Sequence, residues 1–378
     1  MPGTRPDRAG PRLVAVGSAT PPTSYSQQEL LEIFKVEDPR IKSLFLNGGI
    51  QRRYLTLPPE LADGTRLSET QGDLLRKHAT SGVSIGAEAV HKCLKEAGAE
   101  LSDIGHLCCV SSTGFLTPGF SALLIKELGI PVTCSRLDVV GMGCNAGLNA
   151  LTSVSGWAAA NPGKLAVMVC VEVCSAAYVF DGTMRTSVVN SLFGDGAAAI
   201  ALTSDGEDGS GTGADAGAAT GAAVGTGTGI AAGPRLTGFA SQIIPEAVDA
   251  MRYDWDQEHG RFSFFLDQDI PYVVGAHAER TVGRLLAAAG LRRSDIRHWV
   301  IHSGGKKVID AVRINLGLTR HDTRHTTDVL RDCGNLSSGA FLFSYQRLLE
   351  ESVVAPGDNG VLMTMGPGST IETALLRW

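Results

Sequence analysis

Two stretches of this 378-residue chain, 192 positions apart, repeat one another. The sequence CLKEAGAELSDIGHLCCVSSTG, which starts at Cys93, aligns without a gap to LLAAAGLRRSDIRHWVIHSGGK, which starts at Leu285. Each copy has the pattern of a helix end, a glycine cap, a short turn and a strand. The shared SDI and His in one register favour internal duplication over chance similarity in an alanine-rich chain. We therefore predict a chain built of two similar halves.

Continuous apolar runs predict the kind of sheet in these halves. Examples are Leu165 to Val171, Trp299 to Ile301 and Val361 to Met365. Strands without alternating polarity are buried on both faces, which occurs where helices cover both sides of a sheet. We therefore predict an α/β fold whose two halves pack around shared helical layers.

One segment has a different composition. Residues Thr203 to Pro234 are almost entirely Gly, Ala, Thr, Ser and Asp, which bury too little apolar surface to offset the entropy of ordering the chain. The segment lacks GxxxxGK[ST], so its glycines do not indicate a phosphate-binding loop. We predict an N-terminal half over residues 1–202, a flexible surface loop over 203–234 and a C-terminal half over 235–378.

Composition excludes several classes of partner. The net charge of -6 argues against nucleic-acid binding, and no apolar run approaches the roughly 20 residues that cross a membrane. The basic N-terminus precedes too short an apolar stretch for a signal peptide. The eight cysteines show no CxxC or zinc-site spacing, so disulfides and a structural metal are not expected. The expected compartment is the reducing cytoplasm.

One cysteine stands between glycines, in VVGMGCNAGLNAL. A strand at Leu137–Val140, a tight GMG turn and a helix that ends before Asn161 place Cys144 at the helix N-terminus. Unpaired N–H groups and the helix dipole there favour a thiolate and lower the thiol pKa from about 8.5. A small apolar core cysteine is the alternative, and this stretch alone does not decide between the two.

Two further polar residues stand at comparable places. His302 ends the strand of the second repeat, where the first repeat has Val110, and strand ends in open α/β sheets face the ligand crevice. Asn335 lies in RDCGNLSSGAF, in a turn before an apolar helix, where a turn or N-cap role is the ordinary one. Together with Cys144, these two residues form a candidate constellation.

These motifs carry a family resemblance. GMGCNAG around Cys144, SLFGDGAA, IHSGG, GNLSSG and MGPGS resemble, in order, the motif set of the type III polyketide synthases, a chalcone synthase-like family. The resemblance runs from about residue 12 to Trp378 and leaves out only the loop at 203–234. It implies a thiolase-like fold with two similar halves in a layered αβαβα arrangement, and a homodimer.

The resemblance also implies roles for the constellation. Cys144 takes the place of the nucleophile and carries the starter and the growing chain as a thioester. His302 would hold Cys144 as a thiolate through an ion pair. His302 and Asn335 match the donors that stabilise the enolate formed when malonyl-CoA loses carbon dioxide. The family needs no metal and no organic cofactor, and its substrates are coenzyme A thioesters.

Further positions follow from the same resemblance. Phe193 and Phe264 match two gatekeeper phenylalanines between the coenzyme A tunnel and the cavity, although without the family both would be ordinary core aromatics. The chain departs from plant members in its cavity, and its C-terminal loop has TMGPG in place of GFGPG. Thr117 lies in a loop that family members extend across the dimer. The predicted cavity-lining residues are Thr117, Cys174, Ala177 and Ser337, and the predicted coenzyme A contacts are Arg52, Arg53, Lys306 and Lys307.

Within the family, VEDPRIKSLFLN, CCVSSTGFLTPG and HSGGKKVID most resemble bacterial members from glycopeptide-antibiotic pathways. That resemblance implies malonyl-CoA as starter and extender, four units in all, and 3,5-dihydroxyphenylacetyl-CoA as product, with helper enzymes as possible partners. Three alternatives remain at this point. They are a ketoacyl-carrier-protein synthase III-like enzyme, a type III polyketide synthase with another starter and product, and a non-catalytic thiolase-fold scaffold.

Overall fold

Nine strands form the main sheet of the molecule and divide into two groups along the chain. The computed structural model describes residues 10–64, 66–205 and 233–378, and within them the strand order is β11-β12-β13-β8-β1-β7-β6-β4-β5. The first half supplies β1 (Arg12–Ala19), β4 (Ile104–Val110), β5 (Ser135–Val139), β6 (Leu165–Glu172) and β7 (Gly196–Thr203). The second half supplies β8 (Arg235–Ile243), β11 (His298–Ile301), β12 (Asn359–Gly366) and β13 (Thr370–Arg377).

The two groups repeat one spatial order. If the strands are numbered along the chain within each half, their spatial order in the first half, read from β5 to β1, is third, second, fourth, fifth, first. The second half, read from β11 to β8, repeats this order but has no counterpart of β5, the third strand of the first half. The first two strands are joined by α3 (Gln71–Ala97) in one half and by α7 (Ile270–Ala288) in the other. The repeat in the sequence falls on equivalent elements, the ends of these helices followed by β4 and β11. The predicted duplication is therefore present in the fold.

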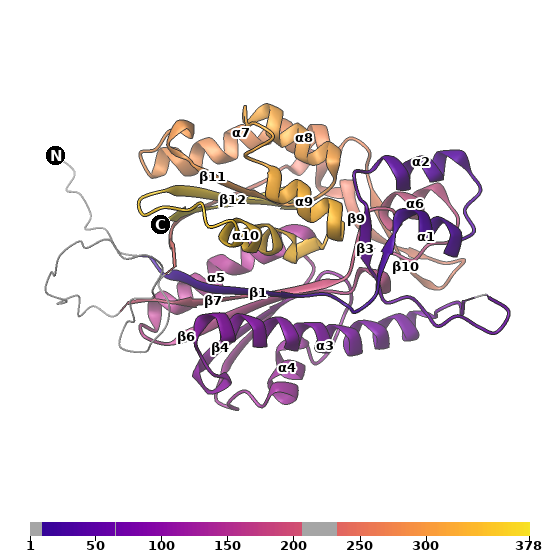
Figure 1. The fold of residues 1–378 in the computed structure, drawn as a ribbon, viewed down its shortest axis with the longest axis horizontal. Helices are drawn as coiled ribbons and strands as arrows, with labels where there is room; N and C mark the ends of the chain where they lie inside the picture. Colours follow the sequence, from indigo (N-terminus) through magenta and orange to yellow (C-terminus); the bar gives the residue numbers. More distant parts are fainter. Residues whose placement is uncertain (1–9, 65, 206–232) are drawn as a thin grey trace, which may run out of the picture.

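Figure 1 shows the layers: helices lie outside each half-sheet and between the two half-sheets. The helices α3 and α4 (Phe120–Leu128) pack on the outer face of the first half, and α7 and α8 (Lys306–Asn315) pack on the second. Between the sheets lie α5 (Ala146–Ala160) and α10 (Ala340–Glu350), whose apolar side chains join strands of both halves in one core cluster. This arrangement is the predicted αβαβα fold.

Local sequence explains these elements. Every residue of β6 is buried, as expected for a strand covered by helices on both faces. Helix α3 begins with a capping box between Thr70 and Asp73 and ends at Gly98, which has the left-handed conformation of a helix C-cap. The predicted runs at 165–171, 299–301 and 361–365 all lie within strands, so the periodicity analysis was correct for the sheet.

A smaller group of elements lies at one end of the layers, beside the strand ends (Figure 1). Its helices are α1 (Gln27–Ile33), α2 (Pro39–Asn47) and α6 (Met184–Asn190), whereas α9 (Arg324–Cys333) packs against α10 in the central layer (Figure 1). Its strands form two antiparallel pairs, β2 (Ser24–Ser26) with β3 (Arg52–Tyr54), and β9 (Met251–Asp256) with β10 (Arg261–Leu266). Single turns of 3₁₀-helix lie at Leu101–Asp103, Gly143–Asn145, Cys174–Ala176, Arg293–Asp295 and Ser337–Gly339, and a longer 3₁₀ segment at Pro245–Ala250.

The predicted loop at 203–234 falls mostly outside the described residues, which stop at 205 and resume at 233. Strand β7 includes Thr203, one residue beyond the predicted end of the first half. The half boundaries at 202 and 235 otherwise stay a prediction. Within the described ranges, no helix is both long and apolar enough to span a bilayer.

Candidate active site

Cys144 lies at the entrance to the central helix α5, as the sequence predicted. Strand β5 leads into a turn in which Gly141 and Gly143 have φ angles of 81° and 68°, and a single 3₁₀ turn then carries Cys144 into α5. A side chain at Gly143 would lie 2.4 Å from the ring of Pro367, so only glycine fits there. Cys144 is 8% exposed and lines a cavity of about 290 Å³.

Residues of the second half contact the sulfur. Ser337 Oγ lies 3.4 Å from Cys144 Sγ, and the Ser337 N–H donates to Asn335 Oδ1 at 2.9 Å. The backbone of Asn335 pairs with the segment around Phe193, since its N–H donates to Leu192 and its carbonyl accepts from Gly194. Asn335 therefore contacts Ser337, whose hydroxyl contacts the sulfur of Cys144.

A buried carboxylate continues this network, and the sequence analysis missed it. Glu172, at the end of β6, accepts hydrogen bonds from the N–H and hydroxyl of both Ser112 and Ser338. The Ser112 hydroxyl lies 2.7 Å from that of Ser337, so a line of polar atoms connects Glu172 to Cys144. Burial raises the pKa of Glu172 to about 6, although its serine hydrogen bonds lower it. The sequence does contain a signal for this site, since Glu172 is a single charged residue at the end of an apolar strand.

His302 directly follows strand β11, and its backbone N–H donates to the carbonyl of Met363 in β12 at 2.8 Å. Strand β12 ends at Gly366, where a side chain would lie 3.0 Å from the backbone nitrogen of Cys144. His302 is 2% exposed, and its Nδ1 has no hydrogen-bond partner among the described residues. His302 and Cys144 thus flank the C-terminal end of β12.

The protonation states differ from the expected ion pair. Burial raises the pKa of the Cys144 thiol to about 12, although the hydrogen bond from Ser337 lowers it. Burial lowers the pKa of His302 to about 3. Both directions favour neutral groups, opposite to the lowered thiol pKa and the ion pair that the sequence led us to expect. The cause is desolvation of the buried sulfur, which opposes the effect of the helix terminus.

The two predicted gatekeepers belong to one aromatic cluster. The rings of Phe193 and Phe264 are 6.4 Å apart and nearly perpendicular, and Tyr178 contacts both, at 4.2 Å and 5.3 Å between centroids. The Tyr253 hydroxyl donates to the Ser112 carbonyl at 3.2 Å. Phe264, Tyr178 and Tyr253 line the Cys144 cavity, so two tyrosines that sequence reasoning missed form its walls.

The predicted cavity-lining residues take different places. Ser337 contacts the nucleophile directly, and Cys174, which is 1% exposed, packs in the same apolar cluster as Cys144. Ala177 packs against that cluster and is partly buried. Thr117 is exposed on the surface and lines neither described cavity of its own chain. A role for Thr117 in a neighbouring subunit stays a prediction.

The predicted coenzyme A contacts divide in the same way. Arg52 and Lys307 are exposed, and the Lys306 side chain lies beside Gly49 while its amine pairs with Asp310 at 2.8 Å. Lys306 and Lys307 begin α8, Arg52 lies in β3, and all three stay candidates. Arg53 is 1% exposed, and its guanidinium is hydrogen-bonded inside the protein, so its contact with coenzyme A stays a prediction.

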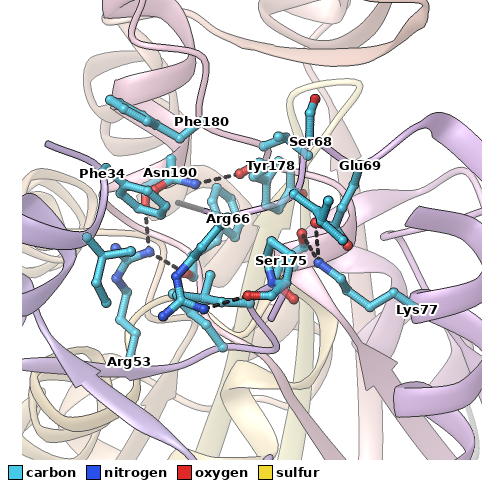
Figure 2. Close-up of a pocket in the computed structure, with 18 of the residues that line it drawn as sticks. Phe34, Arg53, Arg66, Ser68, Glu69, Lys77, Ser175, Tyr178, Phe180 and Asn190 are labelled. Atoms are coloured by element: carbon cyan, nitrogen blue, oxygen red, sulfur yellow. Dashed lines mark hydrogen bonds and ion pairs between the residues drawn. The ribbon is translucent and has the colours of Figure 1, made fainter. Parts of the chain in front are cut away.

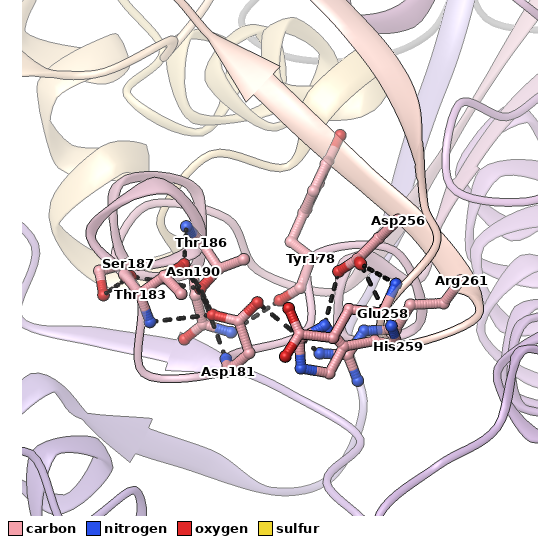
Figure 3. Close-up of polar contacts among 10 residues, drawn as sticks. All are labelled: Tyr178, Asp181, Thr183, Thr186, Ser187, Asn190, Asp256, Glu258, His259 and Arg261. Atoms are coloured by element: carbon pink, nitrogen blue, oxygen red, sulfur yellow. Dashed lines mark hydrogen bonds and ion pairs between the residues drawn. The ribbon is translucent and has the colours of Figure 1, made fainter.

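A second polar cluster lies apart from the residues around Cys144. Asp181, Asp256 and His259 are the group among the described residues whose side chains lie close enough to hold a metal ion. Figure 3 shows that they connect the segment before α6 with the β9–β10 turn. His259 Nδ1 lies 2.7 Å from Asp256, and Asp181 accepts from Thr183 and Thr186. These hydrogen bonds account for the carboxylates without a ligand.

Comparison with known proteins agrees with this geometry. The chain matches the family described as chalcone and stilbene synthases, with the N-terminal domain over residues 5–206 and the C-terminal domain over residues 235–378. The 3,5-dihydroxyphenylacetyl-CoA synthases of Streptomyces toyocaensis and Amycolatopsis orientalis are each 65% identical over 97% of this chain, and the matches cover 90% and 93% of those proteins.

More distant relatives share the fold. The crystal structure of 1,3,6,8-tetrahydroxynaphthalene synthase from Streptomyces coelicolor A3(2), a bacterial type III polyketide synthase, is 26% identical with a TM-score of 0.83, covering 97% of this chain and 99% of that one. PKS-I from the brown alga Ectocarpus siliculosus superposes with a TM-score of 0.85 at 24% identity, over 99% of this chain and 100% of that one. Because both domain models together span nearly the whole sequence, this protein belongs to the chalcone and stilbene synthase family, the type III polyketide synthases.

Proposed function

We propose that this enzyme condenses malonyl-CoA units on Cys144 by decarboxylative Claisen condensation and cyclises the chain to 3,5-dihydroxyphenylacetyl-CoA. The relatives of that name at 63–65% identity support the product. The observation that carries the chemistry is the placement of Cys144 Sγ at a cavity wall, 3.4 Å from a serine that Asn335 holds.

The reaction begins with acyl transfer to the sulfur. The Cys144 thiol loses its proton, attacks the thioester carbonyl of the bound acyl-CoA and releases coenzyme A as its thiol. His302 is the proposed base that accepts this proton, and burial lowers its pKa, so that it starts as a neutral imidazole. The resulting imidazolium would then be the partner of the thiolate.

Chain extension follows on the same sulfur. Loss of carbon dioxide from malonyl-CoA leaves an enolate, and hydrogen-bond donors aimed at its oxygen stabilise the charge as it forms. His302 and Asn335 fill this role. The enolate carbon then attacks the Cys144 thioester, a C–C bond forms, the C–S bond breaks, and the lengthened chain is carried on coenzyme A before it returns to the sulfur.

The dimensions of the cavity suit a short chain. About 290 Å³, enclosed by Phe264, Tyr178 and Tyr253, lies at the lower end of the range for small-molecule sites. Four malonyl-derived units that fold into one ring fit such a space better than a long acyl chain. The TMGPG loop contributes Pro367 and Gly368 to the wall, so it takes part in shaping the product.

The remaining assignments concern the setting of the enzyme. Arg52, Lys306 and Lys307 are the proposed contacts for coenzyme A phosphates, and Thr117 is the proposed contribution of one subunit to its neighbour in a homodimer. All eight cysteines are free, which suits the cytoplasm. No metal, organic cofactor, nucleic acid or membrane is required, and the product serves dihydroxyphenylglycine formation in glycopeptide-type antibiotic biosynthesis, with helper enzymes of that pathway as further partners.

Mass spectrometry of products from the full chain and malonyl-CoA alone tests this proposal. The expected products are 3,5-dihydroxyphenylacetyl-CoA and its free acid. A strict requirement for an acyl carrier protein would instead identify a ketoacyl-carrier-protein synthase III-like enzyme. A pyrone or naphthalene product from malonyl-CoA would keep the family and reject the cyclisation. If the protein shows no condensing activity and iodoacetamide does not label Cys144, the protein is a non-catalytic scaffold.

A further inference from the structure

A second cavity, of about 360 Å³, lies beside the Cys144 cavity. It is bounded by the end of α1, by β3 and the segment after it, by the start of α3, and by the segment from Cys174 to Phe180. Figure 2 shows its polar and aromatic side chains. Tyr178 lines both cavities, so a single aromatic side chain belongs to the wall between them.

The lining of this second cavity is cationic. Among the described residues, five cations and one carboxylate line it. Three of the cations are paired with carboxylates, Lys77 with Glu69 in the lining, and Arg66 and Arg261 with Glu60 and Asp181 outside it. An excess of positive charge inside a concave site attracts anions. The cationic residues are Lys35, Arg53, Arg66, Lys77 and Arg261.

Arg53 forms the inner end of this charge distribution. Its Nε donates to Gln27 at 3.0 Å and its Nη1 to the carbonyl of Phe193 at 2.7 Å, whereas its Nη2 has no hydrogen-bond partner among the described residues. Arg53 has no direct ion pair there, and burial lowers its pKa to about 9, although the nearby charge of Asp195 raises it. A buried cation with an unused donor is costly unless an anion accompanies it.

A second buried polar atom without a partner belongs to a residue that lines the same cavity. Asn190 Oδ1 is buried without a hydrogen-bond partner, while Asn190 Nδ2 donates to the Tyr178 carbonyl at 2.7 Å, which fixes the amide. The cavity therefore presents a cationic donor and a neutral acceptor. A ligand that carries both a carboxylate and a hydroxyl group would satisfy both atoms.

The rest of the lining is aromatic. Phe34 and Phe180 stack with ring centroids 4.9 Å apart, and the rings of Tyr178 and Phe193 pack at a tilt with centroids 4.2 Å apart. Flat aromatic walls favour a planar ring in the ligand. Polar walls alone would suit inorganic phosphate, but two ring pairs around a buried guanidinium suit an organic anion.

We infer that this cavity is a separate binding site for a small aromatic carboxylate, whose carboxylate pairs with Arg53 and whose ring packs among Phe34, Phe180 and Tyr178. A phenolic hydroxyl on such a ligand would donate to Asn190 Oδ1. The site adjoins the reactive cavity without containing Cys144, and the inference does not depend on which polyketide the enzyme makes.

Calorimetric titration of the full chain with phenylacetate and with 3-hydroxyphenylacetate tests this inference. Both should bind, the hydroxylated probe more tightly, and phenethylamine, which has the ring and the opposite charge, should not. Prior alkylation of Cys144 with iodoacetamide should leave the affinity unchanged. Loss of binding after alkylation would place the ligand in the Cys144 cavity and overturn the inference, as would equal binding of phenethylamine.

Two variants locate the site. Arg53→Lys, which keeps the charge and removes the unused Nη2, should weaken phenylacetate binding about 10-fold, the scale of one hydrogen bond to a charged group. Because that buried change can unfold the protein, Ser68→Asp provides a second variant on an exposed cavity-lining residue, with Ser102→Asp as its matched control outside the cavity. The added carboxylate should weaken binding several-fold only at position 68, and equal affinities for the two Asp variants would reject the site.

Discussion

The two halves of the molecule share a strand order but place different groups at equivalent positions. In the first half a 3₁₀ turn carries Cys144 into α5, and in the second a 3₁₀ turn carries Ser337 into α10. These two helices form the central layer, and the sulfur and the hydroxyl are 3.4 Å apart. Duplication thus brought two helix starts face to face, and only one of them holds the proposed nucleophile.

The division of labour extends beyond these two residues. The first half contributes Cys144 and the buried carboxylate Glu172, whereas the second contributes His302 and Asn335. Each half therefore lacks part of the site. The difference teaches that a repeated fold fixes where reactive groups can stand, while single substitutions within each copy decide what they do.

The sharpest test of the comparison exchanges equivalent side chains for alanine. Cys144→Ala should abolish polyketide formation and leave the fold intact, because no other group lies at that helix start to carry the acyl chain. Ser337→Ala should still form an acyl adduct. Intact-protein mass spectrometry after incubation with malonyl-CoA, together with product analysis, measures both. Product at the wild-type rate from Cys144→Ala would reject the covalent mechanism.

Asn335 tests the contribution of the second half to the chemistry. Asn335→Ala should slow malonyl-CoA decarboxylation on the order of 10²-fold, the effect of losing one donor to a developing oxyanion, and should slow starter loading less. Release of labelled carbon dioxide and adduct formation separate the two steps. Asn149→Ala, in which the lost amide binds Glu372, is the matched control. Equal slowing of both steps would contradict the assigned role.

The contact between the halves can be perturbed within α5 itself. A side chain at Gly147 would lie 2.4 Å from the Ser338 carbonyl and 2.8 Å from the Phe341 ring, whereas nothing lies within 4 Å of that position at Gly156. Gly147→Ala should lower the free energy of unfolding by about 1–3 kcal/mol through overpacking. Gly156→Ala should raise it by about 0.5–1 kcal/mol, because alanine favours the helix. Chemical denaturation gives both values, and similar shifts would show that the halves are not tightly packed there.

Glu172 predicts a pH dependence. Burial raises its folded-state pKa from the ordinary 4.5 to about 6, so the folded protein binds this proton more tightly than the unfolded chain. The stability that this proton contributes is complete below pH 4.5 and is lost as the pH rises through 6. The loss is roughly 2 kcal/mol.

Denaturation of the wild type and of Glu172→Gln across this window measures the effect. The stability of the wild type relative to the variant should fall as the pH rises, since glutamine does not titrate. Glu88→Gln removes a half-exposed carboxylate as a control. A stability difference that is constant with pH would show that Glu172 does not titrate with folding.

Much of this arrangement could be predicted from the sequence because its determinants are local. Apolar runs, helix caps and the repeat around Cys93 and Leu285 depend on neighbouring residues, and they gave the strands, the layers and the duplication. The position of Cys144 at a helix start also follows from the glycine turn before it.

The missed features depend on partners far away along the chain. Arg53 is buried because it reaches carbonyls 137 and 140 residues distant, and Glu172 because its partner Ser338 lies 166 residues away. A sequence window shows an arginine in a polar stretch and a glutamate at a strand end, but not the groups that surround them. The thiol pKa was misjudged for the same reason, since burial is a property of the whole fold.

The close fit between Gly143 and Pro367 limits how either segment can change. A side chain at Gly143 would lie 2.4 Å from the ring of Pro367, and a side chain at Gly366 would lie 2.7 Å from the backbone nitrogen of Asn145. A larger residue in one segment would therefore displace the other, so the turn before Cys144 and the TMGPG loop can diverge only together.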